Sequence, residues 1–268
     1  MEKKGKKVEV FQIIVSVFSI IGVLAALIVV PEFRRWVGLD PEETEAVETQ
    51  ADKLVVFYDD DGSLDGTAAL LYLLAHPDVA VQAITISYGE AHPEVYIQHI
   101  GRLLDDLGLS AIPLGAGQDT PLSAGNAFPD WMRQLSDNFW DIPLPNEDRS
   151  YLATNAPDLM VSAINQSNVP VTIFMSGTGT NLAQALRLDP GIRENIDSVY
   201  IMGGAVYVPG NIRDLTPDSP NGVAEWNIYA DPQAAKEVFN SGLDIYLVPL
   251  DATNQVTINI EDTRLWRV

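Results

Sequence analysis

VVFYDDDGSLDGTAALLYLL (residues 55–74) places four aspartates within seven positions, between two apolar runs. The first run, 54–59, is short and rich in β-branched and aromatic residues, which predicts a buried strand. The second, 65–76, has the composition of a helix and ends before Pro77. Acidic side chains at the end of a buried strand indicate a binding or catalytic loop. The stretch therefore predicts a strand, an acidic loop and a helix, with Asp59, Asp60, Asp61 and Asp65 in or beside the loop.

The rest of the body repeats this alternation of apolar strands and amphipathic helices. We expect further strands at 79–89, 112–117, 169–177, 198–204 and 244–250, and helices at 93–108, 157–167, 180–188 and 231–242. Such alternation predicts an α/β fold, a mostly parallel sheet with helices on both faces. Residues 118–152 are rich in Pro, Asn, Asp and Trp and show no period, so we expect a functional loop there.

Polar clusters follow five of the predicted strands. They occupy residues 59–65, 87–90, 176–181, 203–211 and 251–254. In open parallel sheets, ligands bind beyond the carboxyl ends of the strands. Five such clusters at one edge predict a functional site there.

The N-terminal segment reads as a membrane anchor. Residues 1–10 carry four lysines, and 11–30 are apolar without a charge, long enough to span a bilayer. Because the apolar run is longer than that of a cleaved signal peptide, we favour a signal anchor, although cleavage stays open. The positive-inside rule places residues 1–10 in the cytoplasm and the domain after the linker outside it. Residues 31–53 are then a linker, and 54–268 form the main domain.

Composition excludes some classes of site and partner. The 268-residue chain has no cysteine, which rules out disulfides and thiolate metal sites, and a formal net charge of -21. This acidic balance argues against nucleic acid as a partner, since phosphate neutralisation needs Lys and Arg. It is compatible with cation binding, although acidic surfaces are commonly just solvated.

Two enzyme families have acidic loops of this kind. DDDGSL (59–64) resembles the D-x-D-G-[TS]-[LV] motif of haloacid-dehalogenase-type phosphohydrolases, whose first aspartate attacks phosphorus beside Mg²⁺. That family also needs a phosphate-neutralising lysine and a later acidic pair. Neither Lys53 nor Lys236 lies at a predicted strand end, and the later strand ends in Met-Gly-Gly. This resemblance is therefore limited to six residues.

The second resemblance extends from Leu54 to Gln255. Asp59, Asp61 and Asp65 match the first three aspartates of the D-x-D-x-G-x-D-D motif of inosine–uridine-type nucleoside hydrolases. Further blocks similar to that family follow in order: GTGTNLA (177–183), MGGA (202–205) with GN (210–211), AEWNIYADP (224–232) and PLDATN (249–254). Because each block follows a predicted strand, we favour this family over the phosphohydrolases.

This resemblance implies an N-glycosidase. The family hydrolyses ribonucleosides to base and ribose by water attack assisted by Ca²⁺, a hard cation that prefers oxygen ligands. The resemblance implies that Asp61 binds Ca²⁺ and acts as the general base, and that the backbone carbonyl of Thr180 is a second ligand. Asp60 is a further candidate ligand, and Asp59 is expected to orient Asp61 or the loop. The implied ribose-binding residues are Asp65, Asn211, Glu225 and Asn227.

The chain also departs from the family pattern. The fourth aspartate of the opening motif, a Ca²⁺ ligand in the family, is Gly66 here, and the asparagine after the second strand is Glu90. The family continues beyond the point where this sequence stops, and its later part supplies a His-Asp pair. We therefore expect the 54–268 domain to be incomplete at its C-terminus, and its activity alone is uncertain. A non-catalytic ribosyl-binding protein remains the third alternative. Base preference and homo-oligomer formation are left open.

Overall fold

The computed structural model describes residues 53–123, 126–145 and 150–256. The predicted anchor at 11–30 and most of the linker at 31–53 lie outside these residues. Within the described ranges, no helix combines the length and apolar character that crossing a bilayer requires. The main domain is therefore the part of the prediction that the structure addresses.

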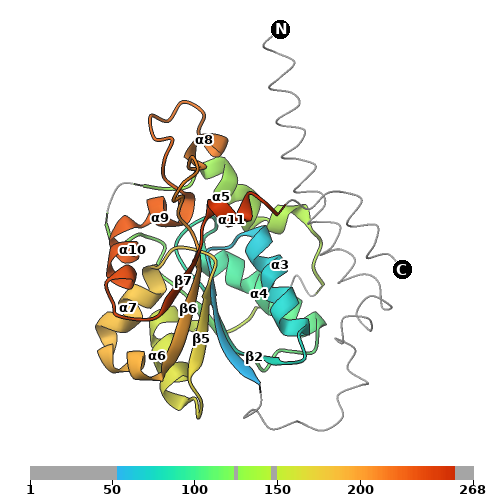
Figure 1. The fold of residues 1–268 in the computed structure, drawn as a ribbon. Helices are drawn as coiled ribbons and strands as arrows, with labels where there is room; N and C mark the ends of the chain where they lie inside the picture. Colours follow the sequence, from blue (N-terminus) through green and yellow to red (C-terminus); the bar gives the residue numbers. More distant parts are fainter. Residues whose placement is uncertain (1–52, 124–125, 146–149, 257–268) are drawn as a thin grey trace.

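Seven parallel strands form one sheet in the order β4-β3-β2-β1-β5-β6-β7 (Figure 1). They are β1 (Leu54–Asp60), β2 (Val79–Ile86), β3 (Leu114–Ala116), β4 (Thr154–Asn155), β5 (Val171–Met175), β6 (Ile196–Met202) and β7 (Ile245–Val248). From β1 the chain first builds outward to β4 and then returns to add β5 on the other side. The acidic loop after β1 thus lies where the strand order reverses, the usual binding position in such sheets.

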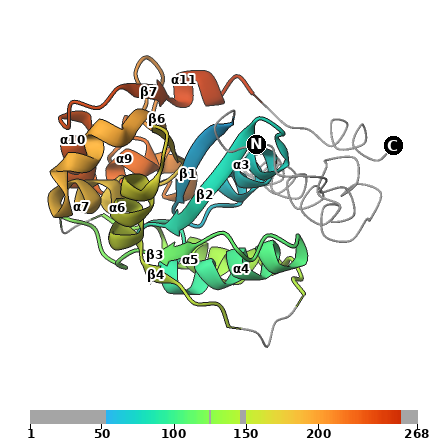
Figure 2. The same cartoon turned by 90° about the horizontal axis from the view of Figure 1, so that it is seen from below.

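Helices cover both faces of the sheet, as predicted (Figure 2). On one side lie α3 (Leu64–Ala75) and α4 (Pro93–Asp106), and on the other α6 (Ala156–Gln166), α7 (Thr180–Leu188) and α10 (Pro232–Phe239). Neighbouring residues of β1 show the two cores, because Tyr58 packs with α3 and α4 whereas Phe57 packs with α6 and α7. Both rings are fully buried, so this central strand has no solvent-facing side.

The structure corrects several element boundaries. The predicted strand 79–89 ends at Ile86. Ser87 still donates its backbone N–H to Asp60 O (2.6 Å), and Ala91 donates to Asp61 O (2.9 Å), so the chain after β2 stays beside the acidic loop. The 118–152 excursion contains α5 (Asp130–Asp137) and the 3-10 turn η3 (Phe139–Asp141). Further short elements without a sequence signal are β4, η4 (Pro190–Asn195), α8 (Ile212–Leu215), α9 (Trp226–Ala230) and α11 (Leu250–Thr253). Elements this short show no periodicity to detect.

Candidate active site at the carboxyl end of the sheet

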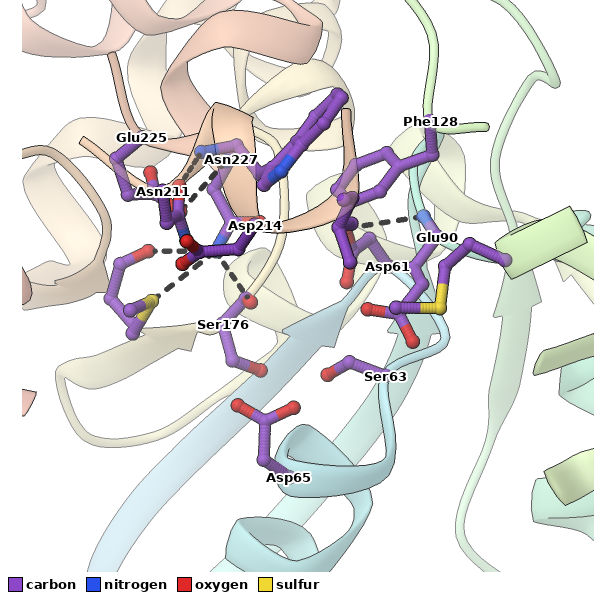
Figure 3. A pocket seen from close by; sticks show the side chains of 14 residues that line it. Asp61, Ser63, Asp65, Glu90, Phe128, Ser176, Asn211, Asp214, Glu225 and Asn227 are labelled. Carbon is purple, nitrogen blue, oxygen red and sulfur yellow. Dashed lines mark hydrogen bonds between the residues drawn. The ribbon is translucent and has the colours of Figure 1, made fainter. Parts of the chain in front are cut away.

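A cavity of about 260 Å³ lies beyond the carboxyl ends of β1, β5 and β6 (Figure 3). Its lining combines carboxylates, amides and hydroxyls with several apolar side chains. The lining residues are Asp61, Ser63, Asp65, Glu90, Phe128, Met132, Ser176, Met202, Asn211, Asp214, Leu215, Glu225, Trp226 and Asn227. Five of these are acidic and none is Lys or Arg, so the cavity has a negative potential suited to cations and hydroxyl donors.

Asp61 occupies the position that the strand order predicts for a reactive group. It follows β1 directly, is 1% exposed and lines the cavity. One of its carboxylate oxygens accepts a hydrogen bond from the backbone N–H of Glu90 (3.3 Å). Burial, followed by the negative charges of Asp60, Glu90 and Asp65, raises the pKa of Asp61 well above its usual range. A bound cation would oppose this rise and keep the carboxylate ionised.

Two glycines give Asp61 its space. A Cβ on Gly89 would lie 2.3 Å from Asp61 Oδ2, and a Cβ on Gly177 would lie 2.5 Å from the Asp61 backbone nitrogen. Real Cβ atoms do not approach other atoms so closely. Both glycines are therefore part of the site, although neither carries a functional group.

Asp59, which we expected to orient Asp61 or the loop, lies beside the cavity and not in its lining. Its side chain is fully buried and is absent from the cavity lining, because Thr85 Oγ1 (2.7 Å) and Asn181 Nδ2 (2.8 Å) both donate to its Oδ1. Burial raises the pKa of Asp59 to about 7. It therefore has no direct side-chain contact with Asp61 among its hydrogen bonds, and it connects β1 with β2 and α7.

Thr180, whose backbone carbonyl we expected to bind Ca²⁺, is not in the cavity lining. It is the first residue of α7, it is fully buried, and its hydroxyl donates to Asp231 Oδ2 (2.7 Å). Ser176, directly after β5, lines the cavity, whereas Thr180 does not. The carboxyl end of β5 thus contributes to the site four residues earlier than the motif comparison implied.

All four predicted ribose-binding residues line the cavity: Asp65, Asn211, Glu225 and Asn227. Asn227 Nδ2 donates to the carbonyls of Ser176 (3.0 Å) and Met202 (3.1 Å), which joins α9 to the ends of β5 and β6. Asn211 Oδ1 accepts from the backbone N–H of Trp226 (3.0 Å). The residues from the GN and AEWN motifs are therefore connected to each other and to the sheet edge.

Glu225 also stabilises the local backbone. It is the N-cap of α9, and its carboxylate accepts from the backbone N–H groups of Asn227 (2.9 Å), Ile228 (3.2 Å) and Gly204 (2.9 Å). Burial raises the pKa of Glu225, and these three hydrogen bonds oppose that rise. Its carboxylate thus connects the loop after β6 to α9.

Replacing Glu225 with alanine is expected to lower the free energy of unfolding by about 2–3 kcal/mol, because three buried N–H groups lose their acceptor. Glu225→Gln, which keeps one oxygen acceptor, should lose less. Urea unfolding monitored by circular dichroism measures both values. Equal stability of Glu225→Ala and the unchanged chain would contradict this capping role.

Motif comparison missed one group of residues altogether. Phe128 and Met132 come from the aperiodic 118–152 excursion, and Asp214 and Leu215 belong to the short helix α8. Trp226 stacks on Phe128 with ring centroids 4.7 Å apart and also lines the cavity. The excursion was predicted to be functional, but no spacing rule singled out these side chains.

The donor set suits a hard cation by its chemistry. Asp60 is buried and Glu90 is partly buried, and no basic residue in the described ranges lowers their pKa values, which are raised to about 6 and about 8. For both groups burial is the largest cause, and Asp65 contributes by its charge. Among the described residues, no three His, Cys, Asp or Glu side chains converge closely enough to hold a metal by themselves. A Ca²⁺ ion here would therefore also use carbonyl, hydroxyl and water oxygens, as Ca²⁺ sites commonly do.

The chain is similar to known nucleoside hydrolases in both sequence and structure. It is 34% identical over 215 residues to the pyrimidine-specific ribonucleoside hydrolase RihA of Citrobacter koseri, covering 80% of this chain and 65% of that protein. RihA of Escherichia coli O1:K1 / APEC is also 34% identical over 215 residues, with 80% and 66% covered.

Solved structures agree. The plant nucleoside hydrolase PpNRh1 superposes with a TM-score of 0.66 at 32% identity, covering 76% of this chain and 62% of that one. The purine-preferring ribonucleoside hydrolase of Gardnerella vaginalis gives a TM-score of 0.69 at 26% identity, covering 80% and 66%. The chain thus spans just under two thirds of the length of these relatives.

The family profile described as "Inosine-uridine preferring nucleoside hydrolase" matches residues 56–268, most of the main domain. The short resemblance to haloacid-dehalogenase-type phosphohydrolases is therefore not a family relationship. With the strand order, the polar groups at the sheet edge and this match in agreement, the chain belongs to the inosine–uridine preferring nucleoside hydrolase family.

Proposed function

We propose that this chain hydrolyses the N-glycosidic bond of ribonucleosides to a free base and ribose. The observation that supports this most is the convergence on one cavity of Asp61 with Asp65, Asn211, Glu225 and Asn227. These residues follow two strands, β1 and β6, and lie in the loops and helices after them. A sugar diol needs acceptors and groups that both donate and accept, which carboxylates and amides supply.

Asp61 is the proposed general base. It would accept a proton from the attacking water as oxygen bonds to the anomeric carbon and the bond to the base nitrogen breaks. A Ca²⁺ ion, which we propose as the cofactor, would make a bound water more acidic and help to orient it. Asp61 is the carboxylate proposed to bind it, with Ser176 in the place first assigned to Thr180. The base takes up one proton as it leaves, so the proton that Asp61 accepts balances the reaction.

The negative potential of the cavity would favour the transition state. As the bond to the base breaks, positive charge develops on the ribose in an oxocarbenium-like transition state. Asp65 and Glu225 line the same cavity, where fixed carboxylates would stabilise this positive charge. No Lys or Arg lies in this lining to oppose the effect.

The apolar part of the cavity is the proposed base-binding region. Phe128 and Trp226 stack there, and Met132 and Leu215 lie in the same lining. Flat aromatic faces bind nucleobases of either size by stacking, so these contacts tolerate different bases. The names of the relatives include both pyrimidine-specific and purine-preferring hydrolases, so the base must be found by assay.

Replacing Phe128 with alanine is expected to raise KM for nucleosides about tenfold with a smaller change in kcat, because one stacking face is worth about 1–3 kcal/mol. Steady-state kinetics with the preferred nucleoside measure the two constants. Phe128→Leu keeps an apolar side chain without the ring, and it should give an intermediate KM. An unchanged KM in Phe128→Ala would move the base-binding region elsewhere.

Ribose release from uridine, cytidine, inosine and adenosine, with Ca²⁺ or with a Ca²⁺ chelator, tests the proposed function. We expect hydrolysis of at least one nucleoside with Ca²⁺ and its loss with chelator. Two p-nitrophenyl substrates distinguish a nucleoside hydrolase from a phosphatase. We expect the chain to cleave p-nitrophenyl riboside and not p-nitrophenyl phosphate. Ribose binding without any hydrolysis or Ca²⁺ dependence would instead support the non-catalytic alternative.

The N-terminal anchor also remains a proposal. We propose that residues 11–30 hold the chain in a membrane with the main domain on the non-cytoplasmic side, because the apolar run follows four lysines. Protease added outside intact cells should then digest the main domain. Protection of this domain until the cells are lysed would contradict the orientation.

A further inference from the structure

Asp60 occupies the space in which a side chain at residue 66 would begin. A Cβ built on Gly66 would lie 2.1 Å from Asp60 Oδ1 and 2.6 Å from Asp60 Cγ. Gly66 lies in the first turn of α3 without a positive φ, so its backbone conformation does not require glycine. Glycine is needed because the carboxyl group of Asp60 fills the space, together with Ser63 Oγ, which would lie 2.5 Å from the same Cβ.

Four donors hold the Asp60 carboxylate in this position. Its Oδ2 accepts from the backbone N–H groups of Gly62 and Ser63, both at 3.1 Å. Its Oδ1 accepts from the hydroxyls of Ser63 (3.1 Å) and Ser176 (2.8 Å). Asp60 thus lies between the N-terminus of α3, which favours negative charge, and the end of β5. Asp60 itself is buried and does not line the cavity, but Ser63 and Ser176 do.

These contacts fix the direction of the Ser176 hydroxyl. A hydroxyl has one hydrogen and two lone pairs. The hydrogen of Ser176 goes to the Asp60 carboxylate, and Tyr58, 3.0 Å from Ser176 Oγ, donates its own hydrogen to Gly66 O (2.5 Å). Ser176 Oγ therefore keeps a lone pair for the cavity that it lines, and it acts there as an acceptor.

The charge of Asp60 also reaches the reactive carboxylate. Asp60 and Asp61 are each 1% exposed, so water screens the charge of Asp60 only weakly at this position. The two carboxylates are consecutive in the chain, yet only Asp61 lines the cavity. Asp60 thus adds negative charge close to the cavity without taking space in it.

We propose that Asp60 supplies the negative charge that an aspartate at residue 66 would bring to the cation site. Asp60 also holds Ser176 Oγ as an oxygen acceptor that faces the cation. The proposal rests on the Ca²⁺ site of the proposed function. It makes Asp60 a positioning residue that acts through Ser176. It also explains why glycine at residue 66 and aspartate at residue 60 occur together, since the two positions share one space.

Calcium titration by calorimetry on the full chain tests the charge. Asp60→Asn keeps the size of the side chain and removes the charge, so we expect Ca²⁺ to bind at least tenfold more weakly, because residues supporting metal ligands commonly contribute 10–100-fold. Asp78→Asn removes one charge from the exposed loop before β2, at the opposite end of the strands, and should bind Ca²⁺ within about twofold of the unchanged chain. Ser176→Ala should weaken binding less than Asp60→Asn. Equal affinity of Asp60→Asn and Asp78→Asn would overturn the proposal.

Placing an aspartate at residue 66 of α3, in place of Asp60, provides the reciprocal test. Gly66→Asp alone should lower the melting temperature, since its Cβ collides with Asp60. In the double variant Asp60→Ala with Gly66→Asp, the carboxylate that meets the new Cβ is gone, and the remaining contact is with Ser63 Oγ at 2.5 Å, a hydroxyl that must rotate away. This variant should bind Ca²⁺ at least tenfold more tightly than Asp60→Ala. Failure of the double variant to exceed Asp60→Ala would overturn the proposal. Thermal melts identify any variant that does not fold, and in that case the Ca²⁺ affinity of Asp60→Asn decides.

The titration separates this proposal from the proposed function. A chain that binds Ca²⁺ in an Asp60-dependent manner but releases no ribose contradicts nucleoside hydrolysis and supports the role of Asp60. A chain that hydrolyses nucleosides without binding Ca²⁺ contradicts the role of Asp60 and leaves the hydrolase assignment in place.

Discussion

Replacing Asp61 with asparagine is expected to lower kcat for nucleoside hydrolysis about 10³-fold. A positioned general base contributes about 10²–10⁴-fold, and Asp61 is the only carboxylate that the resemblance and the cavity lining both place at the end of β1. Asparagine has almost the same size but cannot accept the proton from water. Stability should change little, because the side chain of Asp61 accepts one weak hydrogen bond, from Glu90 at 3.3 Å.

Kinetics and thermal melts on Asp61→Asn and Asp78→Asn measure this effect. Asp78 is exposed at the far end of the strands, so its variant controls for the loss of one negative charge. We expect unchanged kcat for Asp78→Asn and similar melting temperatures for both. A kcat within tenfold of the unchanged chain in Asp61→Asn would contradict the general-base role.

Replacing Gly177 with alanine is expected to lower kcat/KM at least 10²-fold, although glycine has no side chain to react. The added Cβ would lie 2.5 Å from the Asp61 backbone nitrogen and 2.6 Å from Asp61 Cβ. The contact involves backbone atoms at the centre of the sheet, which cannot be relieved by a side-chain rotation. Displacement of a catalytic group by about 1 Å can cost about 10²-fold in rate. Overpacking of this kind also costs about 1–3 kcal/mol of stability.

Gly179→Ala is the matched control, two residues further along the same loop. Its Cβ would meet Val238 Cγ2 at 3.2 Å, the end of a side chain that can shift by a few tenths of an ångström. We expect kcat/KM within threefold of the unchanged chain. Comparable losses in the two variants would mean that the loop is generally sensitive and that the contact of Gly177 with Asp61 is not special.

The acidic loop separates what a pattern predicts from what it does not. Asp59, Asp60 and Asp61 are adjacent and chemically identical, and the motif comparison gave them related roles around one metal. In the structure they have three different environments. The side chain of Asp59 contacts Thr85 and Asn181. The carboxylate of Asp60 lies at the N-terminus of α3, and Asp61 lines the cavity. Side chains alternate between the faces of a strand, and Gly62 (φ 89°) turns the chain directly after Asp61.

Two other contributions to the cavity have no local signal in the sequence. The end of β5 is visible in the sequence, but Ser176, rather than Thr180, lines the cavity because the chain leaves the strand there and α7 begins four residues later. Phe128 comes from the aperiodic excursion, and it contributes only because its ring stacks on Trp226, almost one hundred residues later in the chain. Such pairings depend on tertiary packing and have no local signal.

By itself the sequence determined the parallel α/β architecture, the edge of the sheet that carries the site, and the family. Apolar strand runs, helical spacing and motifs that follow strands are local properties, and they survive in any chain that folds this way. Only the tertiary structure decided which of three consecutive aspartates lines the cavity, which residue represents β5 there, and why residue 66 is glycine. These outcomes depend on which atoms share one space, and Asp60 and residue 66, six positions apart, share theirs only after α3 packs against the end of β1.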